Sequence, residues 1–139
     1  MAYDPKVTWA VVQAMMDAFG DEMNSGYLRI YDNTGAVPTN ADDSNGSNIL
    51  LAELALAADA FGACSGAGVI TAGTITADSD ANATGTAAYA RYYKTDGTTC
   101  VFQGLCGTAT SDFVLNSLSI QLHANVSVSG NPTLTLPRE

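Results

Sequence analysis

The N-terminal end of the chain carries the clearest helical pattern. Apolar residues recur there at the 3.6-residue spacing of an amphipathic helix, namely Val7, Ala10, Val11, Ala14, Met15, Ala18 and Phe19. Asp4 can cap such a helix, Pro5 suits its first position, and Gly20 suits its end. The pattern predicts a helix of about 15 residues. It either covers the protein's own sheet, which we favour, or packs as an arm on a neighbouring subunit.

After residue 26 the hydrophobic spacing changes to the two-residue alternation of β-strands. The alternating segments are residues 27–31, 50–56, 69–76, 86–94, 98–105, 113–123 and 126–136. Residues 32–48 are almost all turn formers, which predicts a long exposed loop, and residues 57–68 form a glycine-rich connection. About seven short strands with turns between them predict a mainly β fold, an antiparallel β-sandwich or jelly-roll-like body with one N-terminal α-helix.

The length of the chain, 139 residues, suits one domain. We expect residues 1–25 to form the helix or arm and residues 26–139 to form a single β-sandwich domain. Hydrophobic residues make up 47% of the chain, enough for a core, whereas only 14% is charged. So few charges are typical of a protein that hides part of its surface in an assembly.

An aromatic cluster surrounds a predicted hairpin. Asp96 and Gly97 lie between two β-rich segments and favour a two-residue turn. The predicted register places Tyr93 opposite Cys100, Tyr92 opposite Val101, and Arg91 opposite Phe102. Tyr92 and Tyr93 then point to opposite faces, so one set of side chains can be core while the other is presented outward. Tyr and Arg are frequent in interfaces. We weigh a subunit contact against ordinary sheet packing, with a carbohydrate platform as a lesser option.

The charge of the chain argues against nucleic acid as a partner. Fourteen acidic residues oppose five basic ones, which gives a formal charge of −9. The five basic residues are scattered singly, and phosphate binding needs them clustered. No apolar stretch approaches the length of about 18 residues that a membrane span needs, and no signal peptide is recognisable. We therefore expect no membrane partner and assembly in a cytoplasm.

The sequence contains only weak candidates for chemistry. Residues 62–66 have the spacing of a hydrolase nucleophile elbow around Cys64, but no α/β context surrounds them, and His123 is the only histidine. A flexible loop is favoured, and we expect no enzymatic activity. Residues 78–82 and 42–46 offer oxygen ligands without a full calcium set, so ordinary turns are favoured.

The cysteines predict neither a zinc site nor a disulfide framework. Their number, three, is odd, and none of the paired spacings of structural zinc sites occurs. On one strand Cys100 and Cys106 would be about 20 Å apart, too far for a bridge unless the chain turns near Gly104. We expect buried free thiols for at least two of the three, and no metal or cofactor.

Several segments taken together carry a resemblance to a known family. They are Gly26–Asp32 after the helix, the polar loop Thr34–Asp43, Ile49–Leu54, Gly85–Ala87, Ala90–Tyr93, the Asp96–Gly97 turn, Gly104–Gly107, Leu118–Ile120, Val126–Val128 and Leu134–Pro137. In this respect the chain resembles small virion structural proteins of tailed bacteriophages. The resemblance covers nearly the whole chain and implies a location in the virion and a β-rich fold. The length of the 32–48 loop and the three cysteines depart from the pattern.

This resemblance implies a structural role. We expect a capsid decoration or cement protein that binds the major capsid protein and its own copies, with a trimer favoured because capsid lattices offer three-fold positions. The alternatives are a collar, neck or tail-associated protein and a receptor- or glycan-binding fibre module. The expected contact residues are Trp9, Met15, Tyr89, Arg91, Tyr92, Tyr93 and Phe102.

Overall fold

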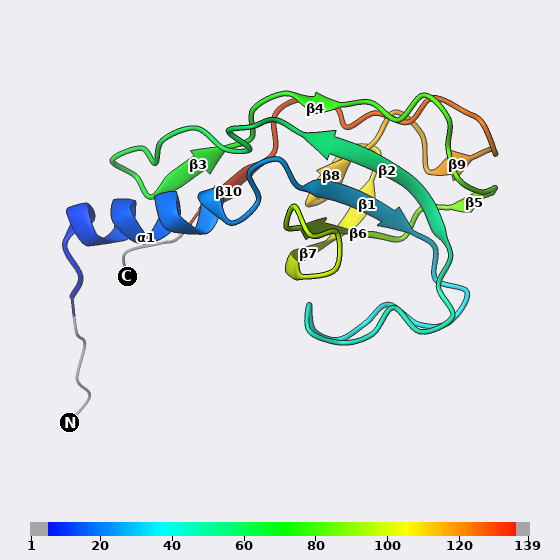
Figure 1. The fold of residues 1–139 in the computed structure, drawn as a ribbon, viewed down its shortest axis with the longest axis horizontal. Helices are drawn as coiled ribbons and strands as arrows, with labels where there is room; N and C mark the ends of the chain where they lie inside the picture. The colour runs from blue at the N-terminus through cyan, green and yellow to red at the C-terminus, as the bar shows by residue number, and fades with distance from the viewer. Residues whose placement is uncertain (1–5, 136–139) are drawn as a thin grey trace.

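The computed structural model describes residues 6–135, which form a mainly β fold with one helix (Figure 1). The β-rich class expected from the alternating pattern is therefore confirmed. The elements are α1 (Trp9–Asp21), β1 (Tyr27–Tyr31), β2 (Leu50–Leu56), β3 (Val69–Thr71), β4 (Ile75–Thr76), β5 (Gly85–Thr86), β6 (Tyr89–Tyr93), β7 (Cys100–Gly107), β8 (Phe113–Val114), β9 (Ser119–Ile120) and β10 (Thr133–Thr135).

Six of these strands form one curled sheet in the order β4-β2-β1-β6-β7-β8. Two short sheets, β10-β3 and β5-β9, lie at opposite ends of the molecule (Figure 1). All neighbours are antiparallel except β7 and β8, so the expectation of a purely antiparallel body is wrong there. The parallel pairing is limited to two residue pairs, Cys106 with Phe113 and Gly107 with Val114.

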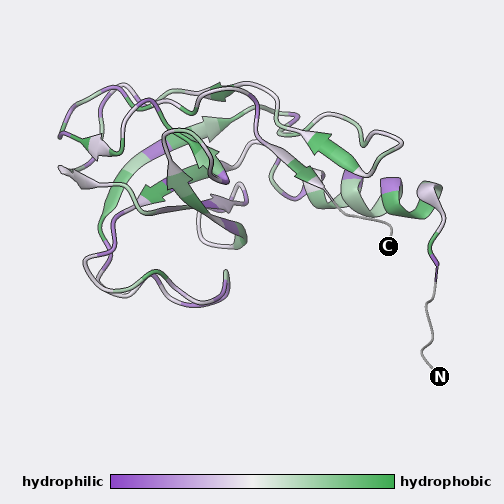
Figure 2. Cartoon of the chain, turned by 180° about the vertical axis from the view of Figure 1, so that it is seen from behind, coloured by the Kyte–Doolittle hydropathy of each residue, from purple (hydrophilic) through white to green (hydrophobic). Residues whose placement is uncertain are grey.

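One face of the large sheet carries the main hydrophobic core. Leu28 and Ile30 of β1, Leu54 of β2 and Tyr92 of β6 point to this face and are at most 1% exposed. Residues from the short strands and the later loops cover them, among others Ile70, Phe113, Leu115, Ile120 and Val126. Hydrophobic residues accordingly colour most of the central strands green in Figure 2.

The opposite face of the same sheet carries a separate tyrosine cluster, Tyr31, Tyr89 and Tyr93. The long 32–48 loop runs beneath the sheet and covers this face (Figure 1). The loop contains no strand or helix, as the sequence predicts. Its covering role was not predicted, because few of its residues are apolar.

Helix α1 starts later than expected, and it buries the side opposite to the predicted apolar stripe. Thr8 is its N-cap, since the Thr8 hydroxyl accepts a hydrogen bond from the main-chain N–H of Val11. The predicted start is thus wrong for residues 6–8, and Asp4 and Pro5 lie outside the described residues. The buried residues are Val12, Met16 and Gly20. The predicted apolar stripe is exposed apart from the half-buried Phe19.

Gly20 explains the orientation of α1. A Cβ atom at this position would lie 3.2 Å from Cβ of Phe61 and 3.4 Å from Cδ1 of Ile70. The absence of a side chain therefore lets the helix approach β3 and the Phe61 segment closely. The helix packs on the small β10-β3 sheet rather than on the large one.

The predicted hairpin between β6 and β7 is confirmed, with one change of register. Tyr93 pairs with Cys100 as expected, but Tyr92 pairs with Phe102 and Arg91 with Gln103. The register shifts between Tyr92 and Tyr93, so that Val101 is left without a partner in β6. Gly97 adopts a positive φ of 69°, which glycine tolerates at no steric cost.

Two predicted strands near the C-terminus are shorter than expected. Residues 113–123 contain only the two-residue strands β8 and β9, and His123 lies in a turn with a positive φ of 67°. It is therefore not on a strand face. In residues 126–135 the strand is confined to β10, and the remainder forms isolated bridges at Val126 and Val128.

Candidate functional site

Side-chain amides of the 32–48 loop bind the tyrosine cluster that this loop covers. The Tyr31 and Tyr89 rings stack with centroids 5.3 Å apart, and the Tyr31 and Tyr93 hydroxyls are 3.2 Å apart. Asn45 donates to the Tyr93 hydroxyl at 3.1 Å and accepts from the Tyr89 hydroxyl at 2.9 Å. Asn48 donates to the Tyr89 hydroxyl at 3.0 Å. These bonds hold the 32–48 loop against the sheet.

Arg91 is the buried arginine of this face and is only 3% exposed. Its Nε donates to Oε1 of Gln103 at 2.9 Å. Its two terminal nitrogens donate to the main-chain oxygens of Asp43 and Asn40, at 2.8 and 3.1 Å. All three acceptors are neutral, and two of them belong to the loop. Arg91 therefore fixes the loop conformation rather than presenting a charge at the surface.

Asp32 closes the base of the loop. One of its carboxylate oxygens accepts from the Ile49 and Thr34 main-chain N–H groups, at 2.7 and 3.2 Å, and the other accepts from the Thr34 hydroxyl at 2.5 Å. Burial alone would raise the pKa of Asp32, but these hydrogen bonds to the carboxylate outweigh it and lower the pKa. The carboxylate is therefore the form that holds both ends of the loop together.

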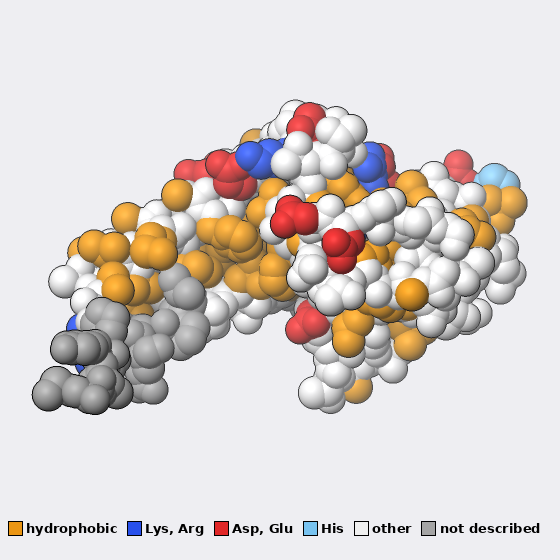
Figure 3. Space-filling view, turned by 90° about the horizontal axis from the view of Figure 1, so that it is seen from below, with side chains coloured by type: hydrophobic (Ala, Val, Ile, Leu, Met, Phe, Trp, Pro, Cys, Tyr) orange, Lys and Arg blue, Asp and Glu red, His pale blue; other side chains and the backbone are white. Residues whose placement is uncertain are grey.

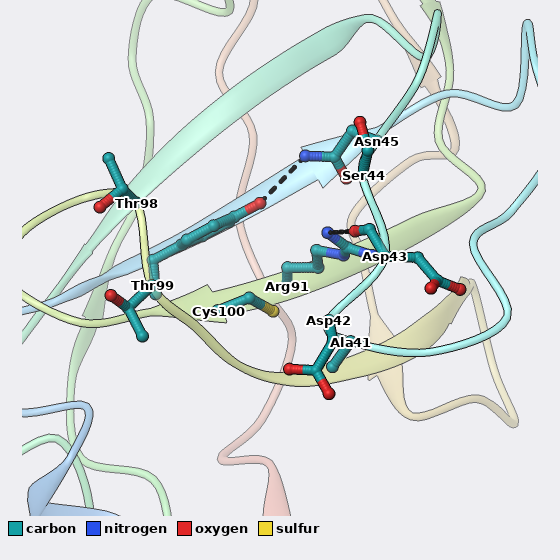
Figure 4. A pocket seen from close by; sticks show the side chains of 10 residues that line it. Ala41, Asp42, Asp43, Ser44, Asn45, Arg91, Thr98, Thr99 and Cys100 are labelled. Carbon is teal, nitrogen blue, oxygen red and sulfur yellow. Dashed lines mark hydrogen bonds between the residues drawn. The ribbon is translucent and has the colours of Figure 1, made fainter.

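A cavity of about 420 Å³ opens between the loop and the β6–β7 hairpin (Figure 4). Its walls contain Ala41, Asp42, Asp43, Ser44, Asn45, Arg91, Tyr93, Thr98, Thr99 and Cys100. Asp42 and Asp43 are the acidic residues of the lining, and its one basic residue, Arg91, already donates to Gln103, Asp43 and Asn40. One Asp43 carboxylate oxygen already accepts a hydrogen bond from the main-chain N–H of Asn40.

The other candidate calcium segment, residues 78–82, forms an Asx turn. Oδ1 of Asp78 accepts a hydrogen bond from the main-chain N–H of Asp80 at 2.9 Å. Among residues 6–135, no three His, Cys, Asp or Glu side chains are grouped closely enough to hold a metal ion. The three cysteines are free thiols, but only Cys64 is buried, whereas Cys100 and Cys106 are half-buried, so the expected burial of at least two is wrong.

The residues of the hydrolase-like spacing do not form a catalytic pair. Cys64 is buried and donates to the main-chain oxygen of Ser65, and its own N–H donates to Asp17 at 2.6 Å. Burial and the Asp17 carboxylate raise the pKa of the Cys64 thiol, which disfavours a nucleophilic thiolate. His123 instead pairs with Asp80, at 2.5 Å.

The structure separates the expected contact residues into two groups. Tyr89, Arg91, Tyr92 and Tyr93 are 0–4% exposed within the chain. Of the two alternatives weighed for the hairpin, the burial of these side chains agrees with sheet packing, and the 32–48 loop covers the face that could have been presented outward. Met15, in contrast, is 53% exposed, and Trp9 and Phe102 are half-buried.

Three of the six large hydrophobic side chains that are exposed among the described residues lie on or beside α1. Val7, Val11 and Met15 are 40%, 48% and 53% exposed, and Ala10, Ala14 and Ala18 are also exposed. An apolar groove of about 390 Å³ adjoins them, lined by Met15, Met16, Phe19, Phe102, Leu134 and Thr135. Figure 3 shows hydrophobic side chains gathered over this end of the molecule. We call the exposed residues of α1, Val7 and the groove together the α1 surface.

The α1 surface brings together two of the expected contact residues, Met15 and Phe102. Trp9 belongs to the same helix but packs against the main core. The sequence signal for this surface was the apolar stripe itself, which we expected to be buried. At 13 residues, α1 is not long enough to cross a membrane, and it is the sole helix that the described part of the chain contains.

Comparisons of the chain with protein-family models, with curated proteins and with solved structures found no match.

Proposed function

We propose that this chain is a non-enzymatic structural protein of a tailed-bacteriophage virion, and specifically a capsid decoration protein. The observation that carries the proposal is the α1 surface, because α1 presents apolar side chains on both its buried and its exposed faces. A helix that is hydrophobic on all sides is normally buried. Among residues 6–135 only one side of α1 is covered, and the other side is exposed and available for assembly.

The exposed fractions of the α1 side chains set the free energy that their burial in an assembly would contribute. Fully burying a Val or Met side chain contributes about 1.5–3 kcal/mol. Val11 and Met15 are about half exposed, so covering each contributes roughly 1 kcal/mol. Such contributions are modest singly, and association itself has an entropic cost. They become sufficient where many copies bind to a lattice and each copy makes several contacts.

The composition supports a decoration role. A strongly acidic chain with few basic residues is not attracted to packaged nucleic acid. Binding only to the assembled shell stabilises that shell by mass action, because free subunits do not bind the protein. The resemblance to small phage virion proteins points to the same class. In this proposal the partners are the major capsid protein and further copies of the chain.

The proposal includes a sandwich-like body. The six-stranded sheet forms one layer, and β3 and β9 of the two short sheets contribute Ile70 and Ile120 to the layer that covers its core face. The jelly-roll-like variant of this architecture remains part of the proposal. The covering of Tyr89 and Tyr93 by the loop weighs against a glycan-stacking platform on that face.

The experiment is the copy number of the chain in purified particles, measured by quantitative mass spectrometry against the major capsid protein. Hundreds of copies are expected for a decoration protein. A few dozen or fewer would refute decoration and place the protein in the neck, collar or tail. Absence from the particles would refute the virion role altogether.

A further inference from the structure

The 32–48 loop contains a pair of residues at which an asparagine side chain can react with the main chain. Asn45 precedes Gly46, and the chain contains no other Asn-Gly pair. In such a pair the glycine nitrogen can attack the side-chain carbonyl carbon of the asparagine, because glycine has no Cβ to crowd the approach. Gly46 is exposed with a φ of 59°, and apart from its chain neighbours no atom lies within 4 Å of the position that a Cβ would occupy. The reacting pair therefore lies in an open part of the loop.

We infer that Asn45 is a site of spontaneous modification, at which deamidation releases the 32–48 loop from the tyrosine cluster. The Gly46 nitrogen gives its proton to water or hydroxide and forms a bond to Cγ of Asn45. The bond between Cγ and Nδ2 breaks, and Nδ2 takes up a proton and leaves as ammonia. Water then opens the cyclic succinimide at either carbonyl, which leaves aspartate or isoaspartate at position 45. Water is the sole co-reactant, so the reaction is independent of the proposed role in the virion.

The folded loop restrains both groups that must react. Nδ2 of Asn45 donates to the Tyr93 hydroxyl at 3.1 Å, and Oδ1 of Asn45 accepts from the Tyr89 hydroxyl at 2.9 Å. The main-chain N–H of Gly46 donates to the Ser44 hydroxyl at 3.1 Å. The leaving group and the nucleophile therefore have separate hydrogen-bond partners, and ring closure needs these bonds to break. We expect the reaction to proceed from conformations in which the loop has opened, at a rate set by the population of those conformations.

The products cannot restore the contacts that Asn45 makes. Both products lack the Nδ2 donor that binds the Tyr93 hydroxyl. In isoaspartate the main chain runs through the former side-chain carbon, so the loop is lengthened by a methylene group. The main-chain oxygen of Asn45, which accepts from the Asn48 N–H at 3.1 Å in the native turn, then belongs to a free carboxylate. Modification is therefore expected to loosen the cover over the tyrosine cluster, and to do so irreversibly.

The test is incubation of the full chain in warm, mildly alkaline buffer, with peptide mass spectrometry and enzymatic detection of isoaspartate at each asparagine. Deamidation is expected at Asn45 and not at Asn48, which is hydrogen-bonded in the same loop but precedes Ile49, whose branched side chain crowds the main-chain nitrogen. The chain unfolded in urea is expected to react at Asn45 at least about tenfold faster than the folded chain. Equal rates at Asn45 and Asn48 would overturn the site, and equal rates in the folded and unfolded chain would overturn its control by the loop.

Tyr89→Phe and its matched control Tyr31→Phe test which contacts hold the loop closed. The two rings are buried and stacked on each other, so the variants remove the same atom from one cluster. The Tyr89 hydroxyl bonds to Asn45 and Asn48 of the loop, whereas the Tyr31 hydroxyl bonds to that of Tyr93 in β6. Tyr89→Phe is expected to speed deamidation of the folded chain about tenfold, and Tyr31→Phe to change it less than about twofold. Thermal unfolding checks that both variants are folded, and equal acceleration in both would overturn the inference.

Hydrogen exchange tests the release of the loop. Ion-exchange chromatography separates modified from unmodified chains of the same incubation, because modification adds a negative charge. The main-chain N–H groups of residues 32–48 are expected to exchange faster in the modified chains, whereas those of β1 and β2 exchange as in the unmodified ones. Unchanged exchange of the loop in chains that carry isoaspartate at position 45 would overturn the release.

Discussion

The structure predicts that removal of the Tyr92 hydroxyl raises the stability of the protein. Tyr92 is 1% exposed, and its ring packs against Phe61 and Phe113 with centroids 5.6 and 5.4 Å away. Its hydroxyl has no hydrogen-bond partner among the described residues. Burial raises the pKa of Tyr92, so the hydroxyl stays neutral. Tyr92→Phe removes the unpaired oxygen and keeps the ring contacts.

The magnitude follows from the cost of an unpaired polar group. A buried hydroxyl without a partner costs about 1–3 kcal/mol. Part of that gain is offset by the small void that the missing oxygen leaves. We therefore expect Tyr92→Phe to raise the free energy of unfolding by about 1 kcal/mol, which for a chain of this size raises Tm by roughly 3–4 °C.

Tyr89→Phe on the same strand is the matched control with the opposite sign. The Tyr89 hydroxyl donates to Asn45 and accepts from Asn48, so its removal breaks two hydrogen bonds and leaves both amides short of a partner. A loss of about 1–2 kcal/mol is expected. Urea unfolding at constant m-value measures both variants. If Tyr92→Phe lowers stability, the hydroxyl has a partner in solution and the assignment of an unpaired group is wrong.

Three further predictions concern the loop, the start of β1 and the hairpin. Asp32→Asn replaces a carboxylate that accepts three hydrogen bonds. We expect the free energy of unfolding in urea to fall by about 1.5–3 kcal/mol. An unchanged urea midpoint would contradict the role of Asp32. Gly26→Ala would place its Cβ on the main-chain oxygen of Tyr93. We therefore expect the free energy of unfolding, measured by thermal unfolding, to fall by more than about 3 kcal/mol. A fall of less than about 1 kcal/mol would show that the backbone adapts easily. Hydrogen bonds from Thr99 lower the pKa of Asp96 from 3.8 to about 2. The pKa of Asp96 is lower in the folded than in the unfolded state. Its ionised carboxylate therefore stabilises the fold fully above about pH 5, and this stabilisation is lost as the pH falls toward 2. Asp96→Asn should therefore flatten the fall of the urea midpoint with pH over that window, and an identical fall in wild type and variant would contradict it.

Local patterns in the sequence predicted the large sheet well. The alternation of Leu28 and Ile30 with Tyr27, Arg29 and Tyr31 identified β1, and the Asp96–Gly97 turn identified the β6–β7 hairpin. Both features depend on neighbouring residues, whose propensities are visible in sequence. The register shift beside Tyr92 was not predictable, because the pairing of Phe102 with Tyr92 is set by packing across the sheet.

The candidate site was harder to predict, because the burial of one side of α1 and of the tyrosine face depends on tertiary structure. The apolar stripe of α1 was recognised, but its direction was not, since Gly20 and the buried Val12 and Met16 lie on the opposite side. Helix periodicity identifies an apolar face without saying which face is covered when both are apolar. For the tyrosine face the sequence left a subunit contact and ordinary sheet packing open. A polar loop covers this face through hydrogen bonds of Asn45 and Asn48, which leave no hydrophobic signal in the sequence.

The central claim is that the exposed side of α1 is an assembly surface. The most direct measurement is the number of copies of the wild-type, Val11→Asp and Leu122→Asp chains in particles that assemble with each as the sole source of the protein. Leu122→Asp is the matched control, because Leu122 is 50% exposed, close to the 48% of Val11, and lies outside the α1 surface. We predict equal, high copy numbers for the wild type and Leu122→Asp, and a strongly reduced number for Val11→Asp. Equal copy numbers for all three chains would contradict the claim.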